Sequence, residues 1–401
     1  MGWVSRSLLL FLLLSTVTGQ PAIPQSAPSS DSVLEAAAPV IEELVRVLSN
    51  NRHYQYGLSE EMLVDAMLQG IMEAQQDSYA AILNTTTLSR PGGRHSARAP
   101  DIGLLLASDD FGRPRVASIL PGSPAADSGL MVGDLLLRIH NTNTAGMTPW
   151  ELAPLLSSSE EGEVRLVAER PGEMPRELIL SPSDYQLRTV SLRIGDRFLR
   201  RWRNDEEGRW AWLKVHAYLG EATKNEWTQA IHRIWDAPNV EAIILDLRDN
   251  GGGDNAGVRT LGDFFPAGKP LVHFRSLFGE EGWEEVVYND AYPRARLIAY
   301  PLVVLVNENT ASLAEIVAAT LQETRDIVVV GSETYGKGTT QSWVTISPEY
   351  AVHLTTARWY TPGGRSIDGR GLTPDLRVQD NRLTPWVDEE LMAAVGVLER
   401  R

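Results

Sequence analysis

Apolar residues recur at different spacings along the chain, and these spacings divide it into a helical start, a strand-rich middle and an alternating body. Residues 33–48 place apolar side chains three and four positions apart, which predicts a helix. A second stripe of this kind runs from about residue 60 to residue 77. Between residues 84 and 100 the periodicity is lost around Pro91-Gly92-Gly93, so we expect a connector beside a domain boundary.

Short strands and turns then extend from residue 101 to about residue 187. The predicted strands are 102–107, 115–120, 134–139, 163–169 and 176–180, with a helix at 148–156. This pattern predicts a small β-rich domain.

The remainder alternates continuous apolar runs with helical stripes. The runs 243–247, 302–306 and 327–330 predict strands buried on both faces, and the stripes 223–234, 255–264 and 314–322 predict helices. Such alternation predicts an α/β fold whose sheet is largely parallel.

The first 19 residues have the pattern of a secretory signal. Arg6 precedes an apolar run at Leu8–Leu14, and small residues lead up to Gln20. A membrane anchor is the alternative, but the run is shorter than the roughly 18 apolar residues that span a bilayer. We therefore expect an exported protein, periplasmic or otherwise extracytoplasmic, without a transmembrane anchor after signal cleavage.

Composition narrows the chemistry. The chain has 401 residues, a length that favours two or three units, and its net charge of −15 disfavours nucleic acid as a partner. The absence of cysteine excludes disulfides, thiolate metal sites, a cysteine nucleophile and a lipidated cysteine. The seven histidines form no zinc or catalytic-triad pattern, so we expect no metal and no cofactor.

Ser312 lies where the buried strand 302–306 passes through a polar turn into a helix beginning near Leu313. A helix N-terminus offers free N–H groups that can stabilise a developing oxyanion, so Ser312 is a candidate nucleophile. Ser312 and Glu315 also match a capping box, and a serine before a helix is more often a cap. This segment alone leaves both interpretations open.

Lys337 lies in the segment 331–339, which nearly matches a phosphate-binding loop. Gly338 stands where that loop needs Ser or Thr, and residues 341–346 alternate like a strand, so nucleotide binding is disfavoured. A lysine in a loop after a buried strand could instead lose its proton by desolvation and act as a base. Its ordinary pKa of about 10.4 would have to fall by roughly three, and a plain surface lysine is the alternative.

A third segment, 245–253, runs from an apolar strand into Gly251-Gly252-Gly253. Three glycines suit a backbone that must approach a ligand closely, although a tight turn is the simpler interpretation. Glycine N–H groups here would complement the Leu313 N–H as oxyanion donors.

Four blocks together resemble the carboxy-terminal processing proteases, also called tail-specific proteases, which are serine-lysine peptidases with an inserted PDZ domain. The blocks are 245–253, 305–316, 335–341, and 354–367 with 371–375. Ser312 and Lys337 are 25 positions apart, as the family requires. The chain departs from the usual sequence of this family at two positions: Gly251 stands where proline is common, and Leu313 stands where alanine is usual.

The resemblance implies a crotonase/ClpP-like β-α protease core. It makes Ser312 the nucleophile, Lys337 the base and Gln341 the amide that holds the lysine amine, with Gly253 and Leu313 as oxyanion donors. It also implies a PDZ domain, whose carboxylate-binding loop would be Ile102-Gly103-Leu104-Leu105 and whose turn is 122–130 before Gly133-Asp134. Such a domain adds a substrate tail as an extra strand.

The predicted division follows from these assignments. It is a signal peptide at 1–19, a linker at 20–31, a helical region at 32–83, a connector at 84–100, the PDZ domain at 101–187, the protease core at 188–380 and a C-terminal helix at 381–401.

The implied activity is an endopeptidase that cleaves proteins near free, apolar C-termini. An adaptor protein and a homo-oligomer are further partners that the resemblance suggests. Two other functions stay open: a non-catalytic binding protein on the same fold, as in retinoid-binding relatives, and a protease that is inactive without its adaptor.

Overall fold

The computed structural model describes residues 30–50, 60–74, 77, 79–84, 102–109, 111–156, 162–183, 185–195, 209–254, 256–265, 268–277, 284–288, 297–325, 327–379 and 387–400. The predicted signal peptide, nearly all of the linker and nearly all of the connector lie outside these residues. None of the described helices has both the length and the apolar composition that a bilayer crossing requires.

The chain forms two compact units, residues 1–68 and residues 69–401. The first contains α1 (Ser30–Asn50), and α2 (Glu60–Ala74) begins in the first unit and ends in the second. Both predicted N-terminal helices are thus confirmed. The apolar stripe of α1 is exposed, since Val40, Leu44 and Val47 are each more than half accessible.

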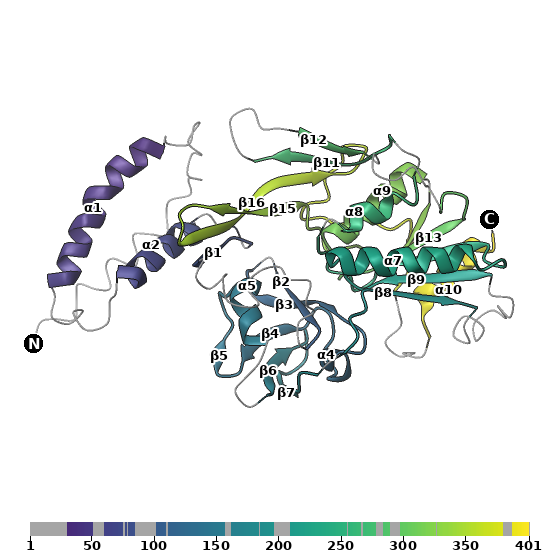
Figure 1. Ribbon diagram of the computed structural model, residues 1–401, viewed down its shortest axis with the longest axis horizontal. Coiled ribbons are helices and arrows are strands. Elements are labelled where there is room, and N and C mark those ends of the chain that lie inside the picture. Colours follow the sequence, from purple (N-terminus) through teal and green to yellow (C-terminus); the bar gives the residue numbers. More distant parts are fainter. Residues whose placement is uncertain are drawn as a thin grey trace, which may run out of the picture. The chain divides into compact units, whose positions relative to one another are not determined.

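The predicted β-rich domain is present in the second unit (Figure 1). Its elements are β2 (Leu104–Ser108), β3 (Pro114–Ile119), α4 (Pro124–Asp127), β4 (Leu135–Ile139), β5 (Thr142–Asn143), α5 (Pro149–Leu152), a 3-10 helix at Ala153–Leu156, β6 (Val164–Glu169) and β7 (Arg176–Leu180). The sheet has the order β2-β3-β4-β6-β7, so β2 lies at an edge. Ile102, Leu136, Ile139 and Val164 are among the side chains that fill its core.

The alternating body contains the predicted parallel sheet, with the order β17-β14-β13-β10-β9-β8. The strands are β8 (Val190–Ile194), β9 (Trp210–Val215), β10 (Ala242–Asp246), β13 (Leu302–Val306), β14 (Val328–Gly331) and β17 (Leu376–Arg377). Only the edge strand β8 pairs antiparallel. Every residue of β10 and β13 is buried, as their continuous apolar runs predict.

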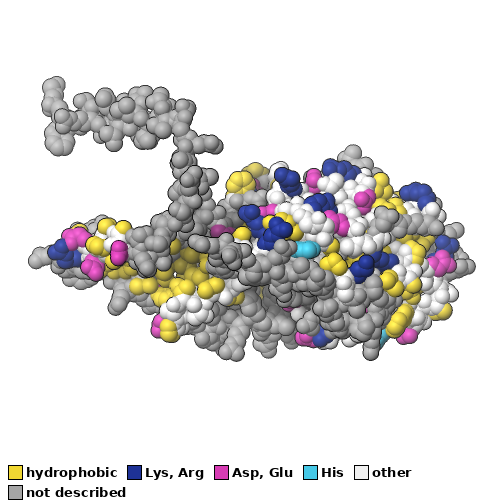
Figure 2. All heavy atoms as spheres, turned by 90° about the horizontal axis from the view of Figure 1, so that it is seen from above, with side chains coloured by type: hydrophobic (Ala, Val, Ile, Leu, Met, Phe, Trp, Pro, Cys, Tyr) yellow, Lys and Arg dark blue, Asp and Glu magenta, His cyan; other side chains and the backbone are white. Residues whose placement is uncertain are grey.

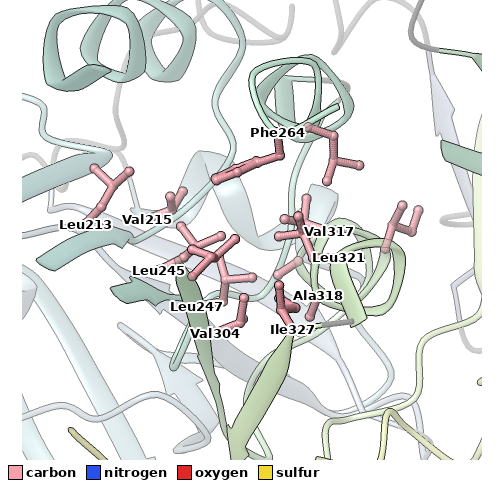
Figure 3. Close-up of a cluster of buried hydrophobic side chains, with 14 of the residues drawn as sticks. Leu213, Val215, Leu245, Leu247, Phe264, Val304, Val317, Ala318, Leu321 and Ile327 are labelled. Atoms are coloured by element: carbon pink, nitrogen blue, oxygen red, sulfur yellow. The ribbon is translucent and has the colours of Figure 1, made fainter. Parts of the chain in front are cut away.

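Helices cover both faces of this sheet. α7 (Gly220–Trp235), α8 (Ala256–Leu261) and α9 (Leu313–Arg325) pack on one face, where Leu245 and Val304 point (Figure 3). α10 (Glu389–Leu398) packs on the other face, where the intervening residues Ile244 and Leu305 point. The period-two alternation of each strand therefore fills two separate cores.

A second, antiparallel sheet was not predicted. It consists of β1 (Ala81–Asn84), β11 (Pro270–Ser276), β12 (Glu284–Tyr288), β15 (Thr339–Thr345) and the long β16 (Tyr350–Tyr360). β1 and β11 pair with successive parts of β16, and β15 runs along its other edge. β15 directly follows the Lys337 loop, so the helix that a phosphate-binding loop needs does not follow it.

The surface charge is dispersed on the face drawn in Figure 2. Acidic and basic side chains there are interspersed among hydrophobic ones, although the net charge of the chain is −15. Among the described residues drawn there, basic side chains thus alternate with acidic ones rather than forming one patch.

Candidate active site

Ser312 lies in the loop between β13 and α9, as the sequence predicts. Its backbone φ is 54°, in the left-handed region that residues other than glycine rarely adopt and that costs on the order of 1–3 kcal/mol. A capping serine has an extended backbone and bonds its hydroxyl to the helix. Among the described residues the Ser312 hydroxyl has no hydrogen-bond partner, so it is not a cap and remains available for chemistry.

Glycines bring the loop after β10 against Ser312. A Cβ added to Gly252 would lie 2.9 Å from the Ser312 Cβ and 3.1 Å from the Leu313 nitrogen. The Gly252 N–H is already used, because it donates to the Asn250 side chain at 2.8 Å. Within the described part of the chain, the N–H groups of Gly253 and Leu313 have no acceptor. These two predicted oxyanion donors are therefore free to bind an incoming oxygen.

Glu315 joins the Ser312 loop to the Lys337 loop. Its buried carboxylate accepts the N–H groups of Ser312 at 2.8 Å, Lys337 at 2.9 Å and Gly336 at 2.7 Å, and also the Thr334 hydroxyl. Burial raises the pKa of Glu315 to about 7, while these donors act in the opposite direction. The capping-box pattern pointed to this glutamate but gave no sign of its contacts with the lysine loop.

Lys337 follows β14 in a loop that other segments hold firmly. Its carbonyl accepts the Trp359 indole N–H at 2.9 Å, and the next N–H, of Gly338, donates to Asp368 at 3.1 Å. Burial, and next the positive charge of Arg115, lower the pKa of the Lys337 amine to about 8. Desolvation of this lysine was predicted, and the lowered pKa makes its neutral form accessible near neutral pH.

Gln341 lies on β15, two residues beyond Thr339. Its amide nitrogen donates to the hydroxyls of Thr339 at 3.0 Å and Thr355 at 3.2 Å. The pairing of β15 with β16 shifts register between Thr340 and Gln341. In this arrangement the amide is anchored to strand hydroxyls beside the Lys337 loop.

The predicted carboxylate loop, Ile102-Gly103-Leu104-Leu105, lies in the β-rich domain where β2 begins. Gly103 has φ 72°, and a Cβ there would come within 2.1 Å of the Ser123 Cβ, so only glycine fits. Its carbonyl accepts the Leu120 N–H at 2.9 Å. Because β2 is an edge strand, an extended peptide can add beside it.

The β-rich domain contacts two loops of the candidate site, the glycine loop after β10 and the loop that carries Lys337. The Gly251 N–H donates to the Ser118 hydroxyl of β3 at 3.0 Å, and a Cβ on Gly251 would lie 2.7 Å from the Ala117 carbonyl oxygen. Arg115, also on β3, places its guanidinium 4.1 Å from the centroid of the Tyr335 ring. Sequence patterns gave no sign of this docking, because its partners are far apart along the chain.

A buried ion cluster anchors the start of the glycine loop. The Arg248 guanidinium pairs with Asp246 at 2.8 Å, Asp388 at 2.8 Å and Glu390 at 3.0 Å. Asp388 caps α10, so this cluster joins the end of β10 to the C-terminal helix. Arg248 and Asp388 are 140 positions apart, so no local pattern in the sequence predicts this cluster.

His216 directly follows β9. Burial lowers the pKa of His216 to about 3, so the ring is neutral, and its Nε2 contacts the Ser191 hydroxyl at 2.9 Å. Across the described residues, no group of three or more metal-ligating side chains is found.

Comparisons with known proteins point to one family. The model of Peptidase family S41 matches residues 209–378, and a PDZ domain model matches residues 115–170. Carboxy-terminal processing protease CtpA of Bacillus subtilis is 26% identical over 391 residues, covering 96% of this chain and 78% of that protein. The chloroplastic carboxyl-terminal-processing peptidase 2 of Arabidopsis thaliana is 32% identical, over 68% of this chain and 52% of that protein.

Among solved structures, the photosystem II D1 C-terminal processing protease superimposes with a TM-score of 0.68 at 23% identity. The match covers 92% of this chain and 98% of that chain. Together with the two family models, this likeness confirms the predicted fold class, an α/β protease core with a β-rich PDZ domain.

Proposed function

The chain belongs to the carboxy-terminal processing protease family, a group of serine-type peptidases, and we propose that it cleaves protein substrates with a Ser312/Lys337 dyad. One observation carries the assignment: a single buried carboxylate, that of Glu315, accepts the backbone N–H groups of both residues. The two loops are thereby held together, although their residues are 25 positions apart.

In this mechanism the neutral Lys337 amine takes the proton of the Ser312 hydroxyl while the Ser312 Oγ attacks the scissile carbonyl carbon. The resulting ammonium gives that proton to the leaving amine, and the carbon–nitrogen bond breaks to leave an ester on Ser312. Water then attacks this ester, with Lys337 again taking the proton and returning it to the serine oxygen. A pKa of about 8 leaves about a tenth of the lysines neutral at pH 7.

The developing oxyanion would be stabilised by the free N–H groups of Gly253 and Leu313. They lie at the glycine loop and the first turn of α9, where the helix dipole adds a favourable field. Gln341 would orient the lysine amine during turnover, which requires its amide to exchange one of its threonine partners for that amine.

The PDZ domain would present substrates by their tails. An extended carboxyl end would add beside the edge strand β2, with its terminal carboxylate at Ile102-Gly103-Leu104-Leu105. An internal segment brings no carboxylate to this loop, so the arrangement favours free C-termini.

We place the enzyme outside the cytoplasm, after removal of the signal at residues 1–19. The apolar run at Leu8–Leu14 supports this placement, and the relatives are named as bacterial or chloroplast processing proteases. An adaptor and self-association would be compatible with the exposed apolar stripe of α1.

The test is cleavage of a fluorescently labelled, unstructured protein with an apolar carboxyl end. We expect Ser312→Ala and Lys337→Ala each to abolish cleavage, and Lys224→Ala, which changes an exposed lysine paired with Glu221, to retain it. Chelators should have no effect. Undiminished cleavage by either dyad variant would refute the assignment.

The same assay separates the alternatives. A non-catalytic binding protein would bind the tail without cutting it, and the free Ser312 hydroxyl argues against that function. An adaptor-dependent protease would cut only after its partner is added.

A further inference from the structure

Residues 77 and 79–84 precede the PDZ domain in the chain but lie against the antiparallel sheet that follows Lys337. Asp77 accepts the Thr355 N–H of β16 at 3.1 Å and the Tyr79 N–H at 3.0 Å. The His353 ring contacts the Tyr79 carbonyl at 3.3 Å, and β1 continues the pairing with β16. The segment is therefore fixed to the sheet on both sides of Tyr79.

This placement brings the Tyr79 ring to the Lys337 side chain. The Lys337 Nζ lies 4.1 Å from the ring centroid, well within the range in which an ammonium is attracted to the negative face of an aromatic ring. The two residues are 258 positions apart in the sequence.

Three charged groups also act on Lys337, one from each neighbouring element. The charge of Arg115, on β3, lowers the pKa of Lys337. The charges of Asp77, which precedes β1, and of Glu315, on α9, raise that pKa. Of these surroundings, the Tyr79 ring is the one whose face lies directly against Nζ. A neutral amine gains little from that face, so the ring acts selectively on the protonated lysine.

We propose that Tyr79 is a positioning residue that holds the Lys337 ammonium against its ring, which makes Asp77 and Tyr79 a part of the active site. Its importance for cleavage rests on the proposed role of Lys337 as the base. The contact with the Tyr79 ring holds the ammonium between turnovers, and it must break when Lys337 loses its proton. Tyr79, which lies outside the ranges 115–170 and 209–378 that the two family models match, thereby sets the balance between the charged and the neutral lysine.

The ring's electronic effect can be tested at constant shape. Tyr79→Phe retains the ring face, while fluorinated phenylalanines at position 79 weaken it stepwise with little change in volume. In a Ser312→Ala background, lysine labelled with ¹³C at Cε reports the Lys337 pKa by NMR, since the chain has only four lysines. The Lys337→Ala spectrum assigns the signal.

We expect the Lys337 pKa in Tyr79→Phe to equal that of the parent, and to fall by about 0.5 between Tyr79→Phe and Tyr79→trifluorophenylalanine. A pKa that is the same throughout the fluorinated series would overturn the proposal. This readout does not depend on cleavage. The same position-79 variants can be made in the enzyme that retains Ser312. If the Lys337 pKa falls along the series while the acidic limb of kcat/KM stays in place, the role of the Tyr79 ring is supported and the role of Lys337 as the base is contradicted.

Discussion

The backbone N–H of Lys337 donates to the buried carboxylate of Glu315 at 2.9 Å, through the same oxygen that accepts the Ser312 N–H. This shared acceptor fixes the backbone of one candidate catalytic loop against the other. This bond acts on the main chain of Lys337, whereas the amine of its side chain lies 4.1 Å from the centroid of the Tyr79 ring.

Glu315 should make stability depend on pH. Its folded pKa of about 7 is above its ordinary value of about 4.5, so the unfolded chain loses this proton first and native stability falls as pH rises between those values. Glu315→Gln carries no titratable proton and should lack this loss. Urea unfolding at pH 5 and pH 7 measures the difference, with exposed Glu221→Gln as control. An equal loss in Glu315→Gln and wild type would contradict the prediction.

Arg115 should set the pH at which the enzyme becomes active. Its charge lowers the Lys337 pKa, so Arg115→Met should raise that pKa above about 8 and move the acidic limb of kcat/KM to higher pH. The exposed Arg138→Met should leave the limb in place. A limb that does not move in Arg115→Met, or that moves to lower pH, would be inconsistent with this role.

Gly252 should tolerate no side chain. A Cβ at its φ of 96° would meet the Ala311 carbonyl oxygen and the Ser312 Cβ, each at 2.9 Å, so Gly252→Ala should displace Ser312 and reduce kcat/KM by roughly tenfold or more. Gly268→Ala is the matched control, because Gly268 also has a positive φ but open space around it. Similar activities of the two variants would show that the close contact is unimportant.

Removing the Arg248 side chain should lower the free energy of unfolding, because Arg248 pairs with three buried or partly buried carboxylates. Arg248→Met leaves the carboxylates of Asp246, Asp388 and Glu390 without their shared cation in a buried site, which should destabilise the fold by about 3–5 kcal/mol. Lys224→Met removes an exposed pair and should change stability by less than about 1 kcal/mol. Chemical denaturation measures both, and a small effect at Arg248 would mean that water or rearrangement compensates.

The sequence predicted those parts of the fold whose burial is continuous. The runs that became β10, β13 and β14 are apolar at nearly every position, because helices cover both faces of their sheet. In β16 and β11, by contrast, polar residues such as Thr355 and His273 interrupt the pattern, and their pairing partners are distant in sequence. The antiparallel sheet was missed for that reason.

The site shows the same contrast. Ser312, Lys337 and the glycine loop follow the ends of buried strands, and such placement is visible in local patterns. The four donors around Glu315 and the ring of Tyr79 against Lys337 come from segments that meet only in the folded chain. The approach of Gly252, one residue before the predicted oxyanion donor Gly253, likewise depends on loop geometry that composition does not reveal.

The most direct test of the dyad is the cleavage rate of Lys337→Ala with and without small primary amines. The account predicts a rate at least about 100-fold below wild type, partly restored in proportion to the concentration of neutral amine. The same amines should restore nothing in Ser312→Ala. A Lys337→Ala enzyme that cleaves at the wild-type rate without added amine would contradict the central claim.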